Sequence, residues 1–67
     1  MVEVGKYINI KTGNEYFVLD FAVNATNEQD GQDMVIYTLA ETAHYPTRKN
    51  YVREIEEFEV KFKKVED

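Results

Sequence analysis

The residues best suited to recognition chemistry form one basic and aromatic stretch, residues 44–53. Arg48, Lys49 and Arg53 supply three cations there, next to Tyr45 and Tyr51. An arginine guanidinium forms bidentate hydrogen bonds to carboxylate and phosphate groups and lies flat on aromatic rings. The stretch is therefore typical of a site that binds an anion. The alternative is that these cations pair with Glu54, Glu56 and Glu57 and with the acidic first half of the chain, since surface ion pairs are common and weak.

The tyrosines extend this hypothesis to an aromatic groove. If Tyr7, Tyr37 and Tyr51 converge on one face, they form the kind of surface that binds extended peptides. The alternative is that their rings close the rim of the core and keep their hydroxyls in water. We predict a ligand-binding face of five residues: Tyr37, Tyr51 and Arg53, with Arg48 at the rim and Tyr7 beside them.

The residue types needed for catalysis are scarce. The chain has no cysteine and no serine, which excludes thiolate zinc sites and cysteine or serine nucleophiles. His44 is the single histidine, and without nearby ligand spacing it is an ordinary surface residue or, alternatively, a pH-sensitive one. The acidic run at residues 54–59 lacks the pattern of a calcium loop and is typical of a solvated face. We expect no enzyme activity, no cofactor and no metal.

The net charge of −5 restricts the class of partner. Most of it lies in residues 1–33, where two lysines stand against six carboxylates. Nucleic-acid affinity depends on neutralising phosphates, so an acidic chain disfavours DNA or RNA. A protein, a peptide or a small anionic ligand at the basic stretch is the expected partner, although an acidic surface also serves simple solubility.

Composition also predicts the setting. Sixty-seven residues fit one domain, residues 1–67, with a core at about 5–64. The absence of cysteine favours a reducing compartment. The N-terminus lacks the pattern of a signal peptide, and no apolar run is long enough to span a bilayer. We expect a cytoplasmic protein with no membrane segment.

The elements that must position the site are short strands. Residues 11–14 contain Gly13 and Asn14, which tolerate a positive φ and predict a hairpin turn. The predicted strand at residues 15–24 loses its apolar character on one face toward Asp20, which predicts a bend. Polar loops are expected at 25–33 and 41–50. The predicted strands are residues 6–10, 15–24, 34–40, 51–53 and 59–64.

The C-terminal segment satisfies two periodicities. Phe58, Val60 and Phe62 alternate with charged residues, as in a strand. Ile55, Phe58, Phe62 and Val65 also follow helical spacing. We predict a helical turn at 55–58 and then a strand, because a longer helix would leave Val60 in water. Five strands with a helical turn before the last predict an all-β, SH3-like small barrel, and an OB-like barrel is the alternative.

The order of these residues resembles a family of short bacterial and phage proteins known as a domain of unknown function. The matching positions are Gly5 and Tyr7, K-T-G-N-E-Y-x-V-L at 11–19, Ala22, M-V-x-Y at 34–37, Tyr51-Val52-Arg53 and Phe58. The resemblance spans residue 5 to about 62 and implies an SH3-like barrel without an assigned activity. Asn9 and Asn24 stand where members often have histidine, and Glu54 replaces a proline.

Two functions follow as hypotheses. The first is a non-catalytic binding or adaptor module for a peptide or a small anionic ligand at the predicted face. The second is a phage-type interaction protein that binds a host protein or sequesters a nucleotide. Edge strands of a small barrel could also pair between chains, which leaves the oligomeric state open.

Overall fold

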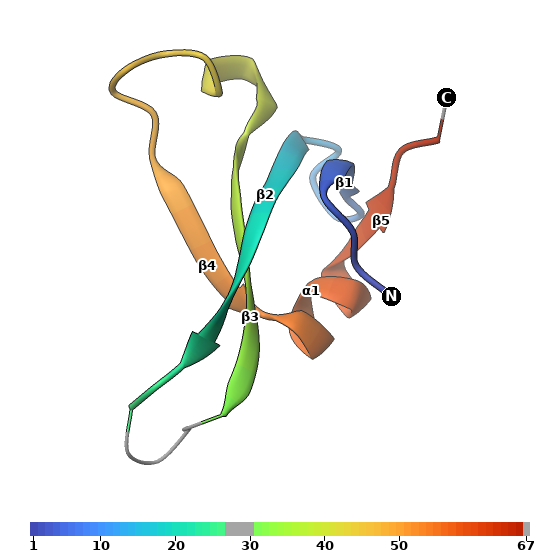
Figure 1. The fold of residues 1–67 in the computed structure, drawn as a ribbon. Coiled ribbons are helices and arrows are strands. Elements are labelled where there is room, and N and C mark those ends of the chain that lie inside the picture. The colour runs from blue at the N-terminus through green and yellow to red at the C-terminus, as the bar shows by residue number, and fades with distance from the viewer. Residues whose placement is uncertain (27–30, 67) are drawn as a thin grey trace.

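The chain folds into one antiparallel sheet whose two edge strands are joined by a helix (Figure 1). The computed structural model describes residues 1–26 and 31–66. The strand order is β4-β3-β2-β1-β5. The elements are β1 (Gly5–Asn9), β2 (Glu15–Asn24), β3 (Gln32–Leu39), the 3₁₀ turn η1 (Ala40–Thr42), β4 (Asn50–Glu54), α1 (Ile55–Lys61) and β5 (Phe62–Lys64).

The sheet is open. β4 pairs with β3 and β5 pairs with β1, and within the described residues β4 and β5 are not paired with each other. The prediction of a mostly β chain with five strands is confirmed. The predicted closure into a barrel is not seen, because α1 stands between the two edges instead of a continuous ladder (Figure 1).

The β1–β2 hairpin forms where the turn residues predicted it. Gly13 has a φ of +78°, a conformation that glycine adopts without a steric penalty. The Oδ1 atom of Asn9 accepts hydrogen bonds from the backbone N–H groups of Lys11 (3.0 Å) and Thr12 (3.1 Å). An asparagine side chain that bonds the backbone two or three residues ahead stabilises a tight turn. The turn therefore holds Lys11 in a defined place.

The β2–β3 hairpin is long and bent. Its register shifts between Val18 and Asp20, which is where the sequence predicts the bend. A bulge of this kind increases the local twist of the strand. β3 begins at Gln32, two residues before the predicted start, because its first residues continue the ladder with Asn24 and Val23. Part of the predicted loop, residues 27–30, lies outside the described residues.

The C-terminal prediction needs correction. The helix covers Ile55–Lys61 rather than 55–58, and the last strand is only Phe62–Lys64. The helix continues to Lys61 because it buries Phe58 fully. It also places Glu57 and Lys61 one turn apart, where they form an ion pair at 3.8 Å. Val60 is left 76% exposed, so the argument that its burial would enforce a strand is wrong.

An aromatic core joins the strands to α1. Its buried residues are Val2, Tyr7, Val18, Val35, Tyr37, Phe58 and Phe62. Phe58 stacks on Phe62 with ring centroids 4.2 Å apart, and its edge contacts with Tyr7 and Tyr37 have centroids 5.2 Å apart. Aromatic pairs of this type contribute roughly 0.5–1.5 kcal/mol each beyond the area they bury.

No helix of residues 1–26 and 31–66 has the length and apolarity to cross a membrane.

Candidate functional site

The side of β4 that faces the core carries two of the five predicted residues, Tyr51 and Arg53. The register places Tyr51 opposite Tyr37 and Arg53 opposite Val35. Residues directly opposite each other on paired strands share a face, and both partners on β3 are buried. Tyr51 and Arg53 therefore point to the core side of the sheet, roughly 7 Å apart along the strand.

Arg53 is held in place from three directions. Its Nε atom donates a hydrogen bond to the Tyr37 hydroxyl at 3.1 Å, and its Nη1 atom pairs with the Glu57 carboxylate. Its guanidinium carbon lies 5.8 Å from the ring centroid of Phe62, within the range of a cation–π contact. The hydrogen bond to Tyr37, followed by the contact with Glu57, raises the pKa of Arg53 above its ordinary value. The group is thus a fixed, permanent cation.

A basic hollow lies in front of Arg53. It has a volume of about 350 Å³ and is lined by Asn9, Ile10, Lys11, Thr12, Arg53, Val60 and Lys61. Lys11 comes from the β1–β2 turn and Lys61 from the end of α1, so the two cations reach Arg53 from different elements. Ile10 and Val60 give the hollow an apolar part. We call this feature the Arg53 hollow.

A second, smaller hollow lies beside Tyr51. It has a volume of about 200 Å³ and is lined by Leu39, Thr42, Tyr45, Thr47, Arg48, Lys49 and Tyr51. Tyr51 is 43% exposed, and its ring centroid is 5.6 Å from that of Tyr37. Arg48 donates from Nη1 to the Ala43 carbonyl at 2.8 Å, which folds its side chain back over the loop. We call this feature the Tyr51 hollow.

The five predicted residues occupy different positions relative to these hollows. Arg53 lines the first hollow, and Tyr51 and Arg48 line the second. Tyr37 is only 5% exposed and supports Arg53 and Tyr51 from behind. Tyr7 is a core residue: its ring packs on Phe58, and its hydroxyl accepts a hydrogen bond from the backbone N–H of Glu3 at 2.9 Å.

Sequence reasoning missed two cations of the Arg53 hollow. Lys11 belongs to the predicted hairpin turn and Lys61 to the segment predicted as a strand, and both lie outside the basic stretch. The only signal for Lys61 was its spacing of four from Glu57, which also binds Arg53. That shared carboxylate brings the end of α1 to β4.

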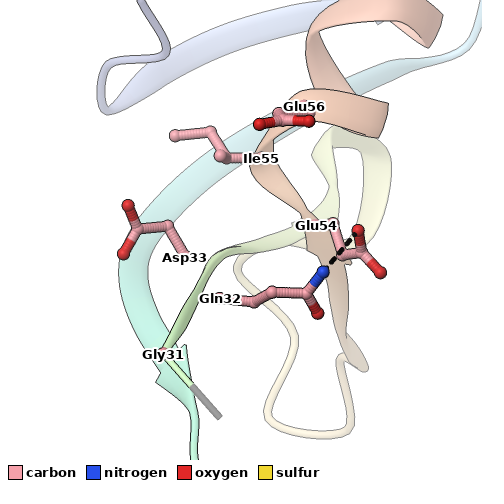
Figure 2. Close-up of a pocket in the computed structure, with 6 residues that line it drawn as sticks. All are labelled: Gly31, Gln32, Asp33, Glu54, Ile55 and Glu56. Atoms are coloured by element: carbon pink, nitrogen blue, oxygen red, sulfur yellow. Dashed lines mark hydrogen bonds between the residues drawn. The ribbon is translucent and has the colours of Figure 1, made fainter. Parts of the chain in front are cut away.

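An acidic hollow lies on another part of the surface, where β3 and β4 meet the start of α1. Its residues are Gly31, Gln32, Asp33, Glu54, Ile55 and Glu56, around a volume of about 240 Å³ (Figure 2). The Nε2 atom of Gln32 donates to Glu54 Oε2 at 3.1 Å. The three carboxylates lie apart from one another in Figure 2. In the part of the chain that the structure describes, no group of His, Cys, Asp or Glu is arranged to hold a metal ion.

His44 remains outside both basic hollows. It is exposed and meets Tyr45 edge-on, with ring centroids 4.7 Å apart. Neither hollow includes the imidazole among its lining groups.

Comparison of the chain with protein-family models, with curated proteins and with solved structures found no match.

Proposed function

We propose that this chain is a non-catalytic binding module that holds an anionic ligand in the Arg53 hollow. The observation that carries the proposal is a guanidinium fixed by Tyr37 and Phe62 and flanked by Lys11 and Lys61. Three cations and one carboxylate, Glu57, give this place a positive balance in a chain whose net charge is −5.

The rigid support of Arg53 favours binding. An immobilised side chain loses less conformational freedom when a ligand arrives, which leaves more of the interaction energy as affinity. The guanidinium has five N–H donors, and the bonds to Tyr37 and Glu57 involve two of them. The remaining donors suit the paired oxygens of a carboxylate or phosphate. Ile10 and Val60 add apolar contact for the body of the ligand.

We also propose that the open sheet is an incomplete SH3-like barrel. The strand order β4-β3-β2-β1-β5 and the helix directly before β5 support this interpretation. Membership of the bacterial and phage family is likewise a proposal, supported by the structural use of its pattern: Gly13 makes the hairpin turn, and Tyr37 and Phe58 are buried. A cytoplasmic setting is proposed from the cysteine-free composition.

The test is a titration of the ¹⁵N-labelled protein, followed by NMR, with mononucleotides, phosphopeptides and acidic peptides. We expect amide shifts at residues 9–12, 53 and 60–61 for at least one probe. Binding should weaken as salt is added, because the cations are open to solvent. If no amide in residues 9–12, 35–38, 44–54 or 60–61 shifts with any probe, the proposed function is wrong.

A matched pair of variants makes the test specific. Arg53→Gln removes the central cation, and we expect the dissociation constant to rise at least about tenfold, since a hydrogen bond to a charged group contributes roughly 1.5–3 kcal/mol. Lys63→Gln changes the net charge by the same amount at an exposed residue of β5. Equal weakening by the two variants would mean that the ligand senses only the net charge.

A further inference from the structure

The outer edge of β4 is unoccupied by any strand of residues 1–26 and 31–66, because β4 ends the strand order. The strand has the sequence N-Y-V-R-E, and its first three residues are exposed. Val52 is 57% exposed although it is apolar. Natural proteins protect such edges with proline, lysine, a bulge or an inward-pointing charge. β4 contains no proline, lysine or bulge, and its inward-pointing charge, Arg53, is already paired with Glu57. An edge of this kind accepts an extended segment by main-chain hydrogen bonding.

Each basic hollow contains one residue of β4, and these two residues follow the period of a strand. Arg53 lines one hollow and Tyr51 the other, and the two residues are separated by one residue on β4. Side chains of an added strand alternate between faces, so every second side chain would meet the face that carries both hollows. Directly opposite side chains approach to about 4.5–5.5 Å between Cβ atoms, which is within reach of an ion pair.

We infer that the ligand is an extended acidic peptide that adds as a strand to the edge of β4. One carboxylate of the peptide reaches Arg53, Lys11 and Lys61, and the side chain two residues away faces Tyr51, Arg48 and Lys49. This inference rests on the proposed function, because it names the ligand of the same site. It predicts acidic residues at alternate positions of the peptide.

Charge complementarity favours an acidic peptide over a second copy of the chain as the strand that pairs with β4. The Arg53 hollow and the Tyr51 hollow contain five of the eight lysine and arginine residues of the protein. Antiparallel pairing of two β4 strands would bring these cations from both copies onto one face, and like charges opposite each other destabilise a strand pair. An acidic strand meets the same cations with the opposite sign.

The experiment uses an acetylated, amidated peptide of about seven residues, long enough to match β4, in which glutamate alternates with valine. Two modified versions carry N-methyl groups on alternate backbone nitrogens, one on the odd set and one on the even set. Only one set faces β4 in an added strand, so we expect one version to bind at least about tenfold more weakly and the other to bind nearly as well as the parent. Hydrogen exchange at the β4 amides should slow in the complex.

Each result distinguishes the inference from the proposed function. Equal binding by all three peptides, or an equal loss in both N-methyl versions, overturns strand addition and leaves an anion-binding hollow. Binding of a mononucleotide at Arg53 without binding of any peptide has the same meaning. Failure of every probe removes both proposals. A dimer seen by sedimentation in the absence of peptide, and abolished by Val52→Pro, would overturn the inference in favour of a second copy.

Discussion

The two edges of the sheet differ in how they meet solvent. β5 has only three residues, two of them the exposed lysines Lys63 and Lys64. Its end is tied back by the pairing of Lys64 with Glu3 and by a hydrogen bond from the Val65 N–H to the Lys6 carbonyl at 3.0 Å. β4 is longer, and its charged side chains, Arg53 and Glu54, are engaged with residues of their own chain.

The two edges therefore differ in the features that hinder pairing with another strand. Short length and lysine side chains discourage the approach of another strand, and β5 has both. β4 has neither, and it is the edge next to the basic hollows. Variants at residues that support one edge or both should show whether the two edges are anchored separately.

The largest effect is expected at Phe58, which supports both edges. Its ring stacks on Phe62 of β5 and contacts Tyr37, the neighbour of β4 residues Tyr51 and Arg53. Phe58→Ala should reduce the free energy of unfolding by about 3–5 kcal/mol. A chain of this length is stable by only roughly 3–10 kcal/mol, so the variant should be largely unfolded or close to it. Urea unfolding followed by circular dichroism measures the loss.

Val60 provides the control for Phe58 on the same helix. Because its side chain is exposed, Val60→Ala should change the free energy of unfolding by no more than about 0.5 kcal/mol. A larger loss for Val60→Ala than for Phe58→Ala would mean that the helix packs by another face.

A smaller effect, confined to β4, is expected at Thr38. Its side chain is fully buried, and its hydroxyl donates to the Lys49 carbonyl at 2.7 Å, directly before β4 begins. Thr38→Val keeps the shape and removes the bond, which should lower stability by about 1 kcal/mol. Hydrogen exchange should accelerate at the β4 amides and stay unchanged at β5. Thr47→Val, at an exposed residue of the loop between η1 and β4, is the control. Equal acceleration of exchange at β4 and β5 in Thr38→Val would contradict separate anchoring of the two edges.

The smallest effect concerns the Glu3–Lys64 pair beside β5. The hydrogen bond from Lys64 lowers the pKa of Glu3 below its ordinary value of 4.5. A carboxylate with a lowered pKa stabilises the fold fully above the unfolded pKa, and this contribution disappears as the pH falls through the folded pKa. The stability difference between the wild type and Glu3→Gln should thus be fully present at pH 7 and decrease as the pH falls below 4.5.

The measurement for this pair is the urea midpoint of both proteins across that pH range. Glu41→Gln, which removes an exposed carboxylate in η1, is the control for the loss of one negative charge. A difference that grows as the pH falls would have the wrong sign for this contact.

Sequence reasoning located most strands because turn chemistry and alternation are local. Gly13 with Asn14 marked the first hairpin, and the change of character at Asp20 marked the bend of β2. The C-terminal segment was harder, since Phe58 and Phe62 satisfy both periods and only tertiary packing decides between them. Burial of Phe58 prevailed over burial of Val60.

The site was predictable only along β4. Tyr51 and Arg53 are separated by one residue, Val52, so strand periodicity was enough to place them on one face. Lys11 and Lys61 line the same hollow as Arg53 because the β1–β2 turn and the end of α1 lie near β4. That arrangement depends on the tertiary structure and not on local periodicity. Tyr7 could not be separated from Tyr37 or Tyr51 by composition, because burial distinguishes these rings and residue type does not.

The position of Glu57 sets a threshold for any ligand of the Arg53 hollow. This carboxylate pairs with Arg53 and lies 3.8 Å from Lys61, so it acts as a tethered competitor that is present at a high local concentration. A ligand that reaches only the donor held by Glu57 exchanges one carboxylate for an equivalent one. A ligand with several charges, or with two oxygens aligned to the guanidinium fork, gains over that exchange. If the hollow binds an anion as we propose, Glu57 favours ligands with several charges or a bidentate group, and Glu57→Gln should reduce that preference.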